Sequence, residues 1–107
     1  MNKITLDHSQ DYLIWREGSG NTVEIFDLLV MSDRRVGMGR KLVDILIEKV
    51  TGEADLIFAF TRPSNRISQK FYTGIGFLRM GVLYSFYRNE TGSGTRYEDT
   101  IIWGRKL

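Results

Sequence analysis

Apolar and polar positions near the start of the chain follow the period of β-strands. Two short runs of this kind are Lys3–Leu6 and Tyr12–Arg16, separated by the polar residues 7–11. A longer apolar run, Thr22–Met31, is interrupted by only two acidic residues and predicts a strand that is covered on both faces. We expect these three segments to form a meander of strands.

The stretch from Met38 to Val50 has a helical period instead. At 100° per residue its apolar side chains form one broad arc, and all but one of its charged side chains take the opposite side. Thr51 and Gly52 follow, and glycine is the residue most often found just past a helix end. The sequence therefore predicts an amphipathic helix lying on a sheet.

A second strand and helix follow. Leu56–Phe60 predicts a buried strand, and a strand–helix–strand connection is right-handed with its two strands parallel. Ser64 or Asn65 is a natural cap for the second helix, and Gly74 and Gly76 close it.

Two further strands, Phe77–Arg88 and Tyr97–Lys106, are expected at the end of the chain, joined by a glycine-bearing hairpin loop over 89–96. The element order is thus β-β-β-α-β-α-β-β. It predicts an α/β (α+β) fold with a mixed central sheet of about six strands and two main helices, in a single domain over residues 1–107.

Composition narrows the possible functions. The chain has 107 residues, and its apolar content of 42% is enough to form a hydrophobic core. Its net charge of +2 is too small for the basic surface of a nucleic-acid-binding protein. It has no cysteine and one histidine, His8, so we expect neither a thiolate nucleophile nor a metal site. No run reaches the 18 or so apolar residues of a membrane span, and the first ten residues lack a signal-peptide layout. A cytoplasmic protein with no membrane partner is expected.

The junction after the third strand combines glycine with positive charge. The first turn of a helix has unpaired backbone N–H groups and the positive end of the helix dipole, so it can bind an anion. Gly37 and Gly39 remove the Cβ atoms that would keep a phosphate away, and basic residues surround them. Taken alone, the glycines could simply permit a tight turn. A P-loop is excluded because the sequence has no G-x-x-x-x-G-K-[ST] motif, and a dinucleotide fingerprint is excluded because Leu42 stands where its third glycine is needed.

The second helix has a polar, uncharged edge beside its apolar stripe. Asn65, Ser68 and Tyr72 fall within about 60° of one another on a helical wheel, a position that suits a ligand-facing edge. The alternative reading makes Asn65 a helix cap and Tyr72 a boundary residue between core and solvent.

Together these two segments resemble the cofactor motifs of the GNAT superfamily. Arg34–Gly39 matches the pattern [RQ]-x-x-G-x-[GA], although many members have glycine where Val36 stands. Asn65–Phe77 matches N-x-x-[AS]-x-x-[FL]-Y-x-x-x-G-F. The resemblance implies an N-acetyltransferase that moves an acetyl group from acetyl-CoA (coenzyme A), its co-substrate, to a primary amine.

The resemblance also implies a role for each matching residue. The glycine loop would hold the pyrophosphate, Asn65 the pantetheine arm, and Tyr72 would protonate the departing thiolate. Backbone groups at the end of the third strand would hold the pantetheine and the carbonyl. The implied cofactor-binding residues are Leu28, Leu29, Val30, Arg34, Arg35, Val36, Gly37, Met38, Gly39, Arg40, Lys41, Asn65, Ser68 and Tyr72.

Because the chain has no cysteine, we expect direct attack of the amine in a ternary complex. Glu24 and Asp27 are the candidate bases on the third strand, and since they are three positions apart they should lie on opposite faces. Glu24 is the predicted catalytic base, with Tyr72 as acid; an ordinary hydrogen-bonded carboxylate is the alternative. Glu98 and Asp99 are weaker candidates.

One departure from the family concerns the start of the chain. Members usually have two helices between their first strands, walling the acceptor side, and here only residues 7–11 separate the first two strands. We expect an open acceptor side that suits an amine on a protein or peptide, or a second copy that completes the wall as a homodimer.

Two other functions stay open. One is an acyl-CoA-binding module of the same fold without catalysis. The other is a small basic nucleic-acid-binding domain that uses the arginines of the loop on phosphates and Tyr84 and Tyr87 for stacking. Against the latter, the basic residues gather at one helix start instead of following a groove.

Overall fold

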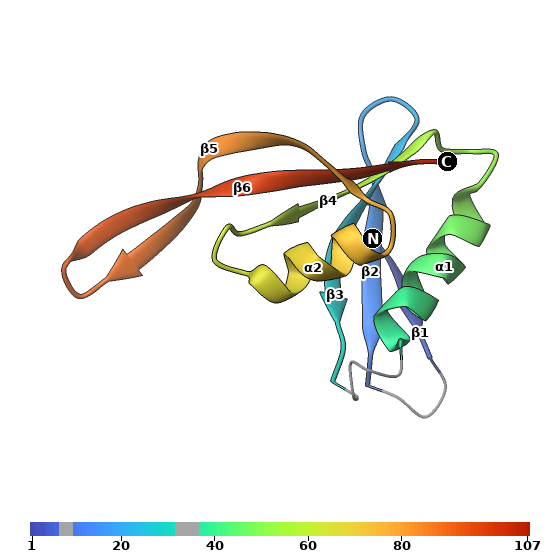
Figure 1. The fold of residues 1–107 in the computed structure, drawn as a ribbon, viewed down its shortest axis with the longest axis horizontal. Helices are drawn as coiled ribbons and strands as arrows, with labels where there is room; N and C mark the ends of the chain where they lie inside the picture. The colour runs from blue at the N-terminus through green and yellow to red at the C-terminus, as the bar shows by residue number, and fades with distance from the viewer. Residues whose placement is uncertain (7–9, 32–36) are drawn as a thin grey trace. The chain divides into compact units, whose positions relative to one another are not determined.

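A computed structural model describes residues 1–6, 10–31 and 37–107 and has the predicted element order (Figure 1). In the six-stranded mixed sheet the neighbouring strands follow the order β1-β2-β3-β4-β6-β5, which confirms the predicted fold class. The elements are β1 (Asn2–Thr5), β2 (Tyr12–Glu17), β3 (Thr22–Leu29), α1 (Met38–Val50), β4 (Leu56–Thr61), α2 (Arg66–Gly74), β5 (Leu78–Thr91) and β6 (Gly94–Lys106).

By its internal contacts the chain divides into two units. The first holds Met1–Phe58 with Lys106–Leu107, the second holds Ala59–Arg105, and β4 runs from one into the other. The prediction of a single domain stays a prediction.

In the first unit, β1, β2 and β3 pair antiparallel in succession, as the expected meander requires. Helix α1 packs on these three strands, and its bounds are those predicted from the sequence (Figure 1). The apolar arc meets the sheet through Leu42 and Leu46, which are fully buried, as is Leu13 of β2. Burying such side chains contributes about 1.5–3 kcal/mol each, so the arc accounts for the placement of α1.

In the second unit, β5 and β6 form a long antiparallel hairpin (Figure 1). The loop predicted over 89–96 is wrong, because Asn89 pairs with Arg96 and Thr91 with Gly94, leaving Gly92–Ser93 as the turn. Most side chains near the turn are exposed, so polar residues fit a strand there as well as a loop. Composition therefore could not separate the two.

The core of the second unit is aromatic. Phe77 and Trp103 are buried, and the Trp103 Nε1–H donates to the Thr61 hydroxyl oxygen at 2.8 Å. The Thr100 hydroxyl donates to the Thr61 carbonyl at 3.2 Å, so the buried hydroxyl and indole groups in this core have partners. These contacts tie β6 to the end of β4.

Candidate functional site

The first turn of α1 begins at Gly37, whose backbone has φ 74° and ψ 25°. This left-handed conformation favours glycine, which explains the residue at this position. Among the described residues no side chain caps the helix, and its first turn has no acidic residue. Arg40 and Lys41 are exposed beside it, while Gly39 is buried. Among the described residues, this helix start carries positive charge and unpaired backbone N–H groups, which suit an anion.

The segment that leads into this helix is only partly described. Arg34, Arg35 and Val36 lie outside the described residues, as does His8. Within the described part, the predicted carbonyl- and pantetheine-binding stretch is the end of β3: Leu28 and Leu29 pair with β2, and Val30 follows the strand.

Asp11 is a buried carboxylate that the sequence did not single out. It is fully buried, and its Oδ1 accepts a hydrogen bond from the Met31 backbone N–H at 2.6 Å. This contact fixes the chain directly before the predicted pyrophosphate loop. In the sequence Asp11 is only an acidic residue directly before a predicted strand. Aspartate is common in turns and loops, so its position alone did not indicate a buried carboxylate.

The polar edge of α2 runs from an exposed residue to a buried one. Asn65 caps the helix, because its Oδ1 accepts from the Ser68 backbone N–H at 3.1 Å, so this part of the alternative is confirmed. Its other part, Tyr72 as a boundary residue, is wrong, because the Tyr72 side chain is buried. Within the described chain the Asn65 side-chain amide nitrogen donates to no other group, which leaves it able to donate to a ligand. Ser68 is half-buried and Tyr72 is buried. The ligand-facing edge formed by these three residues stays a prediction.

The Tyr72 ring is held by other aromatic rings. Its centroid is 5.1 Å from that of Phe77 and 6.4 Å from that of Trp103, with the Trp103 ring inclined by only 23°. Tyr72 is 5% exposed. Its phenol is therefore placed by packing, which is what a group with a fixed role in catalysis requires.

The two carboxylates of β3 already have partners. Glu24 is buried and its Oε1 accepts from the Arg16 Nε at 2.9 Å in an ion pair. Asp27 accepts from the Tyr12 hydroxyl at 3.0 Å, and this hydrogen bond, with smaller effects of burial and of the Asp27 charge, raises the pKa of the Tyr12 phenol. Glu24 thus fits the alternative of an ordinary paired carboxylate, and its role as base stays a prediction.

The expectation that Glu24 and Asp27 lie on opposite faces is wrong. The β2–β3 register shifts at this point: Glu24 stands opposite Arg16, and Asp27 stands opposite Ile14. Cross-strand partners share a face, and Arg16 and Ile14 are two residues apart on one strand, so both acids face the same way. The extra residue is Phe26, a β-bulge, and the Arg16 guanidinium lies 4.6 Å from its ring centroid.

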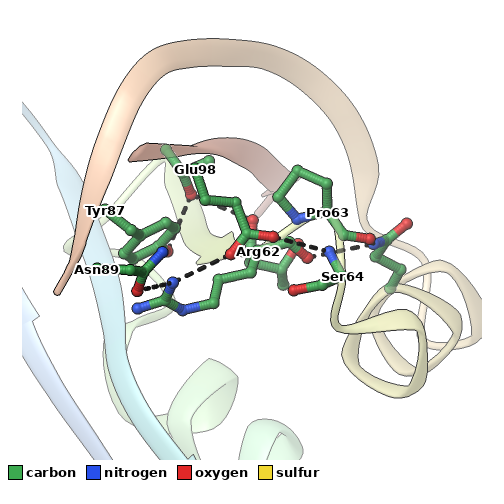
Figure 2. Close-up of polar contacts among 9 residues, drawn as sticks. Arg62, Pro63, Ser64, Tyr87, Asn89 and Glu98 are labelled. Atoms are coloured by element: carbon green, nitrogen blue, oxygen red, sulfur yellow. Dashed lines mark hydrogen bonds and ion pairs between the residues drawn. The ribbon is translucent and has the colours of Figure 1, made fainter. Parts of the chain in front are cut away.

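The weaker base candidates are also engaged. Glu98 accepts from Arg62 Nη1 at 3.0 Å and from the Ser64 backbone N–H at 3.3 Å (Figure 2). Hydrogen bonds from Ser64 and Arg62 lower the pKa of Glu98. Asp99 accepts from the Ser85 backbone N–H at 2.8 Å, and Ser85 is a non-glycine residue with φ 53°.

Over residues 1–6, 10–31 and 37–107, no helix is long and apolar enough to cross a membrane. In the same residues, no group of three or more His, Cys, Asp or Glu side chains could hold a metal ion.

The profile of the FR47-like protein family matches residues 11–85, a stretch that contains both the glycine loop and the α2 motif. The chain belongs to this family, within the GNAT superfamily. The resemblance drawn from the two motifs is therefore confirmed.

Relatives of this FR47-like chain are longer than the chain itself. It is 38% identical over 55 residues to N-alpha-acetyltransferase 30 of Saccharomyces cerevisiae, which is 50% of this chain and 31% of that protein. It matches a candidate streptothricin acetyltransferase of Bacillus anthracis, solved with acetyl coenzyme A, at TM-score 0.80 and 25% identity, over 95% of this chain and 59% of that one.

A third relative supports the fold alone. The ribosomal-protein-S18-alanine N-acetyltransferase of Escherichia coli matches at TM-score 0.71 and 24% identity, over 91% of this chain and 61% of that one. The FR47-like chain thus spans less than two thirds of the length of each of these proteins.

Proposed function

We propose that this chain transfers an acetyl group from acetyl-CoA to a primary amine by direct attack in a ternary complex. The observation that carries the proposal is the edge of α2, where the Asn65 amide, Ser68 and the packed phenol of Tyr72 follow the order of the family motif. The acetyl coenzyme A in the Bacillus anthracis structure supports the choice of co-substrate.

The start of α1 is the proposed pyrophosphate site. Its first-turn N–H groups would bind the phosphate oxygens, and Arg40 and Lys41 would add positive charge. Arg34, Arg35 and Val36 are proposed partners on the basis of the motif alone. For the pantetheine arm and the carbonyl we propose backbone groups of Leu28, Leu29 and Val30, and on α2 the Asn65 amide.

The proposed reaction forms a C–N bond and breaks a C–S bond. A neutral amine attacks the thioester carbonyl and forms a tetrahedral intermediate. The intermediate expels the CoA thiolate, which takes a proton from the Tyr72 phenol, and the remaining extra proton on the amide nitrogen passes to the Tyr72 phenolate and restores the phenol. Glu24 is the proposed acceptor of the proton that the substrate ammonium loses. No covalent acetyl-enzyme is needed, in agreement with a sequence that has no cysteine.

For the acceptor we propose an amine on a protein or peptide. The name N-alpha-acetyltransferase of the yeast relative supports an α-amino group. A homodimer whose second copy walls the acceptor side, and a cytoplasmic location, are further proposals. Sedimentation of the protein with and without acetyl-CoA tests the dimer, and a strict monomer in both conditions counts against it.

One observation favours a second candidate function, a domain that binds acyl-CoA without turnover. Both carboxylates on β3 are already paired, Glu24 with Arg16 and Asp27 with Tyr12. An enzyme of this kind needs a base or a water chain for the substrate ammonium.

An acceptor screen scored by release of free CoA separates the two candidates. Peptides with free α-amino groups, peptides with free lysine amines, and small amines are each mixed with acetyl-CoA and the protein. CoA release above the rate without protein, lost in Tyr72→Phe, supports the transferase. Binding of acetyl-CoA without CoA release from any acceptor class favours the binding domain.

A further inference from the structure

Arg62 lies in the linker between β4 and α2 and has three partners on the β5–β6 hairpin. Its Nη1 donates to Asn89 Oδ1 at 3.1 Å and to Glu98 Oε1 at 3.0 Å. Its guanidinium carbon lies 4.1 Å from the centroid of the Tyr87 ring. Figure 2 shows the side chain reaching these groups from the linker. A planar guanidinium suits this combination of hydrogen bonds and stacking, and a lysine ammonium does not.

The second oxygen of Glu98 binds the linker itself. Oε2 accepts from the Ser64 backbone N–H at 3.3 Å, one residue before the Asn65 cap. From the helix side, Gln69 Nε2 donates to the carbonyls of Arg62 at 3.2 Å and Pro63 at 2.7 Å. The three residues before the cap are thus held by the hairpin and by the helix together.

We infer that Arg62 and Glu98 are positioning residues that fix the start of α2 against the β5–β6 hairpin and so set the Asn65 amide for acetyl-CoA. The inference rests on the proposed function, because Asn65 is the group through which the pair acts. Tyr72 is held separately, by Phe77 and Trp103. Loss of the pair therefore weakens cofactor binding and leaves the acid in place.

A second ion pair on the same hairpin provides the control. Arg88 and Glu90 approach to 2.7 Å, but their side chains are 66% and 65% exposed, whereas those of Arg62 and Glu98 are 40% and 25% exposed. Glu90 also accepts from Thr95 on the neighbouring strand. In the described chain no hydrogen bond or ion pair joins either residue to the linker, so neutralising Glu90 changes the charge of the hairpin by the same amount and leaves the polar contacts of the linker intact.

The test compares wild type, Glu98→Gln, Arg62→Lys and the control Glu90→Gln. Calorimetry gives the Kd for acetyl-CoA, and steady-state assays give KM and kcat. We expect Glu98→Gln and Arg62→Lys to raise the Kd and KM for acetyl-CoA about tenfold, the equivalent of one charge-assisted hydrogen bond. We expect kcat to change less than about twofold. Glu90→Gln should have the wild-type Kd and KM for acetyl-CoA and the wild-type kcat.

A measurement without cofactor tests the contact itself. Amide exchange at Ser68, whose N–H is capped by Asn65, should accelerate in Glu98→Gln and remain at the wild-type rate in Glu90→Gln. Unchanged exchange in Glu98→Gln, or an equal effect of Glu90→Gln, overturns the inference. So does a wild-type Kd in Glu98→Gln when the wild type binds acetyl-CoA. Failure of the wild type to bind acetyl-CoA overturns the proposed function, and with it the cofactor role of the pair.

Discussion

The two helices of this chain begin in different ways. Helix α1 starts at Gly37, in the left-handed conformation, with no side-chain cap among the described residues and with Arg40 and Lys41 exposed in its first turn. Helix α2 starts at Asn65, whose side chain closes the first turn by accepting from Ser68.

The difference indicates two kinds of recognition. An uncapped, positively charged helix start offers backbone N–H groups to an anion and depends little on side-chain identity. A capped start has used one side-chain oxygen internally and offers a single oriented amide to a neutral group. We therefore expect α1 to bind charge and α2 to supply side-chain chemistry, and the substitutions below test that division.

The largest effect is expected at Tyr72. Tyr72→Phe removes the phenolic proton and keeps the ring that packs on Phe77 and Trp103, so kcat should fall about 100-fold or more. The Kd for acetyl-CoA should stay near wild type. Single-turnover kinetics measures the rate of acetyl transfer, and calorimetry measures the Kd. An unchanged kcat would show that Tyr72 of α2 is not the catalytic acid.

The next effect is expected at Gly37. A Cβ at this position meets nothing within 4 Å in the described part of the chain, so Gly37→Ala acts through its φ of 74° and should cost about 1–2 kcal/mol of unfolding free energy. The acetyl-CoA Kd should rise as well. Gly52, at φ 91° just past the C-terminal end of α1, also has open space, and Gly52→Ala is the matched control. An equal change of Kd in the two variants would contradict an anion site at the helix start.

Asn65 permits capping to be separated from ligand binding. Asn65→Ala should lose about 1 kcal/mol of unfolding free energy with the cap, whereas Asn65→Asp keeps a capping oxygen and should be close to wild type in stability. Both variants lack the amide donor, so both should bind acetyl-CoA more weakly. Wild-type affinity in Asn65→Asp would show that Asn65 serves only as a cap.

Much of the fold could be predicted from periodic signals. The bounds of α1 follow from one apolar arc and a glycine beyond its end, and these are local properties. The bulge at Phe26 leaves no mark in the alternation of β3, so the shared face of Glu24 and Asp27 needed the strand register. The pairing of Arg62 with Glu98 joins residues 36 positions apart, and no local pattern contains it.

The pair of Arg62 and Glu98 predicts a pH dependence. Hydrogen bonds from Ser64 and Arg62 lower the pKa of Glu98 from its ordinary value of 4.5. The residue that faces Glu98 on β5 is Tyr87. A lowered folded-state pKa means that the carboxylate stabilises the fold fully above 4.5 and that this contribution is lost as pH falls through the folded-state value. In urea unfolding, the difference in unfolding free energy between wild type and Glu98→Gln should become smaller below pH 4.5. A difference that widens there would contradict the pairing.

The smallest effect is expected at Ser85, which among the described residues is the one non-glycine residue with a positive φ. Ser85→Gly relieves about 1–2 kcal/mol of backbone strain and adds about 0.5–1 kcal/mol of unfolded-state entropy, so a gain of about 0.5 kcal/mol is expected. Ser93, in the hairpin turn, has no positive φ, so Ser93→Gly should give no gain in stability. A loss of stability in Ser85→Gly would weaken the same strain argument at Gly37.

Titration of the wild-type protein with acetyl-CoA in a calorimeter tests the central claim most directly. We predict saturable binding of one acetyl-CoA per chain with a Kd below about 1 mM, in the range of enzyme substrates, and weaker binding at high salt because the pyrophosphate meets a positive helix start. No heat of binding at millimolar acetyl-CoA, with the protein folded by circular dichroism, would contradict the claim.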